Sequence, residues 1–143
     1  MAAEYSAVAS QTLAVNGNAL FANGNRCCKK GYISHRDDSG IFTLKGAYNG
    51  CRAIYKVNFT GNIAIATGGT VEPISIALSL NGEALGNSTA TVTPAAIGDF
   101  FNVSATTFVE IPCSCCVNVS IKNVSATTAI DLTNANILFE RIA

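Results

Sequence analysis

The sequence has few charged residues. Only 13% of its 143 positions are Asp, Glu, Lys or Arg, and nine basic residues balance nine acidic ones. A chain with zero net charge lacks the positive surface that nucleic acids and anionic membranes attract, so we expect neither as a partner. Low charge also removes much of the repulsion between copies of a protein. The composition therefore favours self-association.

Long hydrophobic runs are also missing. No apolar run approaches the roughly 20 residues that a membrane-spanning helix needs. The start of the chain, Met1–Tyr5, does not show the basic and then apolar pattern of a secretory signal, which predicts synthesis without export by that route. Residues 1–12 are rich in Ala and Ser and show no clear period. We interpret them as a flexible N-terminal arm that precedes a single domain over residues 13–143.

Residues that commonly carry out catalysis are scarce. The chain has one histidine and no tryptophan. His35 stands near Asp37 and Asp38, but no motif supplies the third group that would orient it toward a nucleophile. The glycine-rich segment Thr67–Thr70 lacks the spacing of a phosphate-binding loop. We therefore predict a protein that is not an enzyme and needs no cofactor.

Cysteine is the one chemically reactive residue type that is well represented, with six positions. They occur as the pair Cys27 and Cys28, as Cys51, and within Cys113–Cys116. Three interpretations stay open at this stage: buried or free thiols, disulfides between the separate places, and a metal site. For a metal such as Zn²⁺, Cys113 and Cys116 have C-x-x-C spacing and would need further ligands from Cys27, Cys28 or His35.

Alternation of apolar and polar residues dominates the chain and indicates β-strands. The clearest example is Ile74–Asn81, which Asn81 and Gly82 end with the residue pair of a tight hairpin turn. Short strands separated by turn residues predict an all-β, antiparallel sandwich, barrel or jelly roll, with a single helical turn expected at most, in Ala95–Phe101. The expected strands are 31–35, 41–45, 51–60, 63–66, 74–81, its hairpin partner 83–85 continuing through 89–93, 106–111, 116–122 and 136–142.

Two of the expected strands are apolar on both faces. In the last one, Ile137 and Phe139 alternate with Leu138 and Ile142. Residues 107–111 show the same pattern, with Phe108 opposite its neighbours. One face of an antiparallel sheet usually meets water, so something must cover the second apolar face. A second copy of the chain would cover it; the alternative is a central strand that leaves single apolar residues exposed.

Three segments resemble the globular head of bacterial collagen-like surface proteins, which has the tumour necrosis factor/complement-like jelly roll. They are Ala53–Asn62, Ile74–Leu85 and the terminal Ala135–Ala143. The chain differs from these proteins in having no Gly-X-Y collagen stalk. Two other segments, Ile111–Cys116 and Thr91–Ala96, are similar to small proteins of Firmicutes phages and prophages.

These resemblances imply an antiparallel jelly-roll sandwich that forms a tight homotrimer around its inner sheet. The residues expected at the trimer interface are Ile54, Phe108, Leu138 and Ile142. The phage resemblance implies a structural role on the virion surface, as a capsid decoration or fibre-head protein assembled in the bacterial cytoplasm. We expect the N-terminal arm to attach the trimer to a capsid or tail protein.

An alternative function keeps the same fold. The chain would then be the receptor- or carbohydrate-binding head of a spore, cell-surface or tail-fibre protein. Loops such as Asp37–Gly40 or Gly86–Ser88 would carry the ligand, together with Ca²⁺ held by carboxylate oxygens. Genes for capsid and portal proteins beside this one would favour the decoration role, whereas tail or spore-coat genes would favour adhesion.

Overall fold

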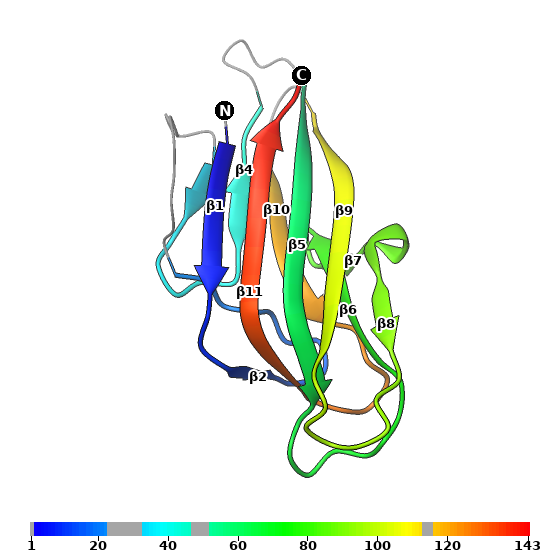
Figure 1. Ribbon diagram of the computed structural model, residues 1–143. Helices are drawn as coiled ribbons and strands as arrows, with labels where there is room; N and C mark the ends of the chain where they lie inside the picture. The colour runs from blue at the N-terminus through cyan, green and yellow to red at the C-terminus, as the bar shows by residue number, and fades with distance from the viewer. Residues whose placement is uncertain (1, 23–32, 47–51, 113–115) are drawn as a thin grey trace.

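Two antiparallel β-sheets packed face to face make up the computed structural model, which describes residues 2–22, 33–46, 52–112 and 116–143 (Figure 1). Sheet A contains, in spatial order, β1 (Ala2–Ala7), β11 (Ile130–Arg141), β5 (Ala53–Ile65) and β9 (Phe101–Ile111), and β2 (Gln11–Leu13) also pairs with β11. Sheet B contains β3 (Ile33–His35), β4 (Phe42–Leu44), β10 (Val117–Asn123), β6 (Ile74–Leu80) and β7 (Glu83–Ala84), and β8 (Ala90–Val92) also pairs with β6.

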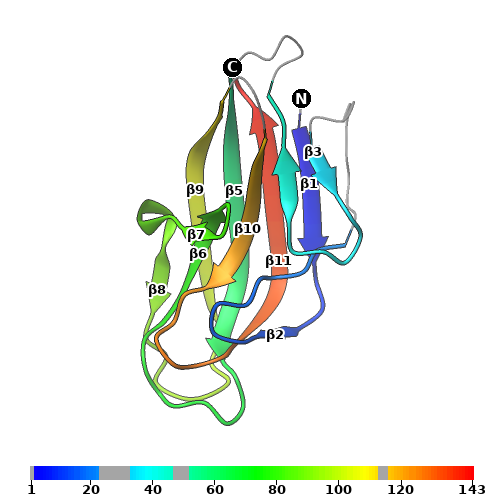
Figure 2. The same cartoon turned by 180° about the vertical axis from the view of Figure 1, so that it is seen from behind.

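The chain crosses repeatedly from one sheet to the other. From β4 it passes to β5 in sheet A, to β6 in sheet B, and by way of β7 and β8 to β9 in sheet A. It then crosses to β10 in sheet B and returns to β11 in sheet A. Figure 2 shows β10 and β6 on the side opposite to that seen in Figure 1. These crossings give the jelly-roll arrangement that the strand pattern predicted.

The β6–β7 hairpin forms where the sequence places it. Asn81 has a φ of 51° and Gly82 has a φ of 91°. A two-residue type I′ turn needs positive φ at both central positions, which Asn and Gly adopt at little cost. The prediction of a tight turn at this residue pair is confirmed.

The helical turn expected in Ala95–Phe101 is wrong. Gly98 has a φ of 87°, which a right-handed helix does not permit, and Phe101 already begins β9. Among the described residues, the one helical element is the short 3₁₀ turn at Gly86–Ser88. No helix in this part of the chain is long and apolar enough to cross a membrane.

Strand β5 corrects a second expectation. The sequence suggested a break between residues 60 and 63, but Ala53–Ile65 is one strand of 13 residues. Gly61 is buried, and a Cβ atom added there would lie 2.9 Å from Leu132 Cδ1. A side chain at this position would press on Leu132 of β11, so the glycine allows close packing inside the strand and does not mark a turn.

The interpretation of residues 1–12 as a flexible arm is also wrong. Ala2–Ala7 form β1, which pairs with β11 along its whole length, and Gln11–Leu13 form β2. Ala3 and Tyr5 point into the core and are buried. The alternation was hard to recognise because one of the two inward residues is only alanine. The domain therefore includes the segment that the sequence seemed to separate at residue 12.

The core lies between the sheets and contains an aromatic cluster near the edge formed by β1 and β3. The Phe42 ring lies with its centroid 4.8 Å from Tyr5, 5.5 Å from Phe21, 4.9 Å from Phe139 and 4.3 Å from His35, on which it stacks. Phe42 and His35 belong to sheet B, whereas Tyr5 and Phe139 belong to sheet A. The cluster therefore joins the two sheets.

A buried asparagine connects the ends of three strands. Asn123 is fully buried, and its Nδ2 donates hydrogen bonds to the carbonyl oxygens of Leu13, at 3.0 Å, and Thr128, at 3.1 Å. Its Oδ1 accepts a hydrogen bond of 3.0 Å from the Ser125 N–H. All three partners are backbone groups, so a residue without a side-chain donor and acceptor would leave them without this partner.

We expect Asn123→Ala to lower the free energy of unfolding by about 2–3 kcal/mol, because it leaves buried backbone groups without partners. Urea denaturation followed by circular dichroism measures the change. Asn87 is exposed in the 3₁₀ turn, and Asn87→Ala is the matched control that should leave the transition midpoint unchanged. Equal midpoints for the two variants would contradict the structural role of Asn123.

Candidate functional site

Four apolar residues lie on the outward face of sheet A, which we call the sheet A face. Ile54, Phe108 and Leu138 alternate along their strands with side chains that are buried in the core, and Ile142 directly follows β11. Phe108 is 65% exposed and Ile142 is 48% exposed, whereas Ile54 and Leu138 are half-buried. The structure thus brings all four residues predicted for the trimer interface to one side of the molecule.

The strand register places these four residues around a polar centre. The Ile142 N–H donates a 2.9 Å hydrogen bond to the Ile54 carbonyl, so these two residues are neighbours. Phe108 lies opposite Lys56, and Leu138 lies opposite Asn58. The sheet A face therefore combines these four apolar side chains with the polar side chains of Lys56 and Asn58, which can form hydrogen bonds.

One ion pair borders this face. Arg52 Nη1 lies 2.9 Å from Glu110 Oε1, and both side chains are more than half exposed. Lys56 is the residue opposite Glu140 in the strand register. An exposed pair of this kind contributes little to stability in a single copy.

Strand β9 leaves one of its edges open. Within the part of the chain that the structure describes, β9 is the last strand of sheet A and pairs with β5 alone. It is 11 residues long and carries Phe108. A long open strand edge beside an exposed aromatic residue is a surface that proteins normally cover to prevent uncontrolled pairing.

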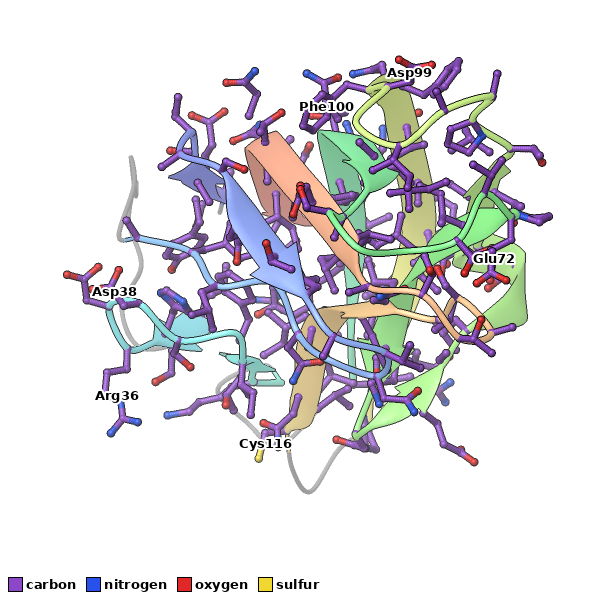
Figure 3. The ribbon with its side chains drawn as sticks, turned by 90° about the horizontal axis from the view of Figure 1, so that it is seen from below. Arg36, Asp38, Glu72, Asp99, Phe100 and Cys116 are labelled. Atoms are coloured by element: carbon purple, nitrogen blue, oxygen red, sulfur yellow. The ribbon has the colours of Figure 1, made fainter. Side chains whose placement is uncertain are left out.

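The loops proposed for ligand binding have mainly structural contacts. In Gly86–Ser88, the Ser88 side chain is buried and its Oγ accepts a 3.0 Å hydrogen bond from the Leu78 N–H. In Asp37–Gly40, the Asp38 N–H donates to the Phe21 carbonyl at 3.0 Å. Figure 3 shows Asp38 at the edge of the molecule, near Arg36. In residues 2–22, 33–46, 52–112 and 116–143, no group of three His, Cys, Asp or Glu residues is arranged to hold a metal ion.

His35 contributes to the core packing. Its ring stacks on Phe42, and Nε2 forms a 2.8 Å hydrogen bond with the Ser39 carbonyl. These contacts turn the imidazole toward the protein interior and its adjacent turn. His35 therefore packs against the core, close in the sequence to Asp37 and Asp38.

Most cysteines cannot be placed in this site. The candidate ligands Cys27, Cys28 and Cys113 lie outside the described residues, and so does Cys51. Cys116 is exposed immediately before β10 (Figure 3). The thiol, disulfide and metal interpretations all stay predictions.

No family model matches the sequence, and no curated protein matches it. Solved structures are similar over its full length. The tumour necrosis factor Eiger of S. frugiperda aligns with a TM-score of 0.65 and 11% identity, over 100% of this chain and 92% of that one. The globular domain of zebrafish complement 1qA aligns with a TM-score of 0.55 and 9% identity, over 99% of this chain and 94% of that one. The chain has the tumour necrosis factor/complement-like jelly-roll fold. Because one fold supports many functions, the surfaces of this jelly roll decide what it does.

Sequence reasoning missed a pocket on the outer side of sheet B. It has a volume of about 270 Å³ and is lined by Asn18, Ile41, Asn81, Gly82, Asn118, Val119, Ser120 and Lys122. The signal that was available is the set of polar residues at alternate positions of β10, Asn118, Ser120 and Lys122, which line the pocket. Their pairing with the neighbouring strands β4 and β6 became visible only once the register was known.

Proposed function

We propose that this chain is a non-enzymatic head domain that works as a homotrimer and self-associates through the sheet A face. The observation that carries the proposal is the convergence of Ile54, Phe108, Leu138 and Ile142, from three neighbouring strands, on one outward face. We infer three copies, and not another number, from the resemblance to the heads of bacterial collagen-like proteins. Covering this face would place the side chains in contact and remove apolar surface from water.

The open edge of β9 supports the same proposal. A neighbouring copy seated against β9 would cover the edge and the exposed Phe108 ring together. A closed ring of copies ends the association at a fixed number, because no free edge is left for a further chain. Interfaces of standard size bury about 1,600 Å² in total, which suffices for a lasting assembly without a cofactor.

We further propose a role on a phage particle, as a capsid decoration or fibre-head protein whose partner is a capsid or tail protein. The resemblance of Ile111–Cys116 and Thr91–Ala96 to phage and prophage proteins supports this role. The attachment route predicted from the sequence has to change, because Ala2–Ala7 is committed to sheet A through its pairing with β11. Attachment would therefore use the surface of the folded trimer.

The second candidate, a receptor- or carbohydrate-binding head, has a specific observation in its favour. The pocket on sheet B lies on the opposite side of the sandwich from the sheet A face. Self-association through sheet A would leave this pocket accessible. A trimeric head could therefore present three copies of the pocket outward.

Light scattering coupled to size-exclusion chromatography tests the trimer. The expected mass is three times the 14.8 kDa of one chain, with and without reductant. Persistence in reductant is expected because apolar contacts, and not intermolecular disulfides, hold the copies together. A folded protein with the mass of a single chain at all concentrations would contradict the proposal.

A further inference from the structure

The pocket on sheet B is lined by residues from four separate segments of the chain. Ser120 and Lys122 come from β10, and Asn81 comes from the turn between β6 and β7. Ile41, the residue before β4, is 48% exposed and is the exposed apolar side chain among the lining residues.

Two asparagines form a rigid end wall. The Asn118 N–H donates a 3.0 Å hydrogen bond to Asn81 Oδ1, and the Asn81 N–H donates a 2.8 Å hydrogen bond to the Asn118 carbonyl. Thr43 Oγ1 donates to Asn118 Oδ1 at 2.8 Å. Because both Oδ1 atoms are already engaged, the orientation of the two amides is fixed before any ligand arrives.

Lys122 also lines the pocket, together with Asn18, its bridge partner. Lys122 Nζ donates to the Gly82 carbonyl at 2.8 Å, which holds the ammonium beside the hairpin turn. An ammonium has three donors, so two are available for a ligand. None of the residues that line the pocket is acidic.

Two buried polar atoms at this face have no protein partner. Ser79 is fully buried, and its Oγ has no hydrogen-bond partner among the described residues. Asn18 Oδ1 is buried in the same way. Buried polar atoms in folded proteins are usually satisfied. Asn18 lines the pocket, so its unpartnered Oδ1 points to water or a polar ligand as the missing partner, whereas Ser79 is not among the lining residues.

We propose that this pocket binds one acidic sugar unit, a pyranose ring that carries a carboxylate. Its volume lies just below the roughly 300–1,000 Å³ of pockets for drug-sized ligands, which fits a single small ring. Lys122 would pair with the carboxylate, and the amides of Asn81 and Asn118 would bind ring hydroxyls. The aliphatic side chain of Ile41, 48% exposed, would pack against the C–H face of the ring.

This inference does not depend on the trimer. The pocket belongs to sheet B, whereas the proposed interface belongs to sheet A. A variant that dissociates the copies should therefore still bind the sugar. A protein that binds the sugar but does not form the trimer would contradict only the trimer proposal, and a trimer that does not bind the sugar would contradict only this inference.

Ligand titrations followed by ¹⁵N-labelled amide NMR test the site, with glucuronic acid, glucose and sodium sulfate as probes. Glucuronic acid should shift the amide signals of Asn118 and Ser120 in a saturable manner. Glucose and sulfate should each bind roughly tenfold more weakly or worse, since each lacks one part of the recognised chemistry.

Lys122→Met is the decisive variant because it removes the charge and keeps an aliphatic side chain. It should weaken glucuronic acid binding by roughly tenfold or more. Lys45→Met is the matched control, an exposed lysine outside the pocket, and should bind as the parent does. Ile41→Ala is the second variant, which should weaken binding of glucuronic acid but not of sulfate.

Three results would overturn the proposal. The first is the absence of saturable shifts with glucuronic acid. The second is equal binding of glucose, which would remove the role of the charge. The third is equal binding of sulfate, which would leave an anion site with no preference for sugars.

Discussion

Phe108→Asp is expected to convert the trimer into folded single chains. Phe108 is 65% exposed in one copy, so an aspartate at this position meets water and leaves the jelly roll intact. In the assembly the same carboxylate would be buried against a neighbour without a partner, which costs several kcal/mol. Repeated at each contact of a closed ring, this cost should abolish association at micromolar concentrations. Light scattering gives the mass, and far-ultraviolet circular dichroism verifies the fold.

Val71→Asp is the matched control for this experiment. Val71 is 51% exposed and lies in the loop between β5 and β6, away from the sheet A face. It introduces the same charge in place of an exposed apolar residue and should remain trimeric. If Phe108→Asp also kept the trimer mass, the assignment of the sheet A face as the interface would be wrong.

Phe42→Ala is expected to produce the largest loss of stability. The side chain is fully buried and contacts aromatic rings from both sheets, with centroids at 4.3–5.5 Å. Its removal leaves a cavity that the facing strands cannot close without shifting against each other. The free energy of unfolding should fall by about 3–5 kcal/mol. This is a large part of the 5–15 kcal/mol that stabilises a typical domain.

Phe100→Ala is the control for the loss of a phenyl ring. Phe100 is 47% exposed, in the loop before β9 at the end of the sandwich away from the two termini (Figures 1 and 3). Its variant should shift the melting temperature by only a few degrees. Comparable melting temperatures for the two variants would show that Phe42 does not connect the sheets as described.

The jelly roll was predictable because the residue pattern within each strand distinguishes its two faces. Alternation in Ile74–Leu80 and in Ile137–Ile142 identifies the two faces of each segment, and this depends on two-residue periodicity alone. The Asn81–Gly82 turn was predictable for a similar reason, since few residue pairs accept positive φ at both positions.

The errors came from features whose meaning depends on distant residues. Gly61 looked like a break, but contact with Leu132, 71 positions further along the chain, explains it. β1 looked like an arm because its pairing with β11 joins opposite ends of the sequence. Local patterns carry no record of such contacts.

The candidate sites divide in the same way. That Ile54, Phe108, Leu138 and Ile142 are apolar residues on the second face of their strands follows from the sequence. That three strands then align them on one surface required the register of sheet A. The pocket on sheet B was invisible at first because its walls come from four separated segments of the chain, near residues 18, 41, 81 and 120.

The sequence by itself determined that this protein is a weakly charged, all-β domain with more apolar strand faces than one copy can bury. Composition and two-residue alternation are sufficient for that conclusion, because each strand displays its faces locally. The tertiary structure alone decided which strands are neighbours, that the N-terminal segment completes sheet A, and that a polar pocket opens on sheet B. These properties arise from contacts between residues far apart along the chain, where the packing of both sheets selects one register among many.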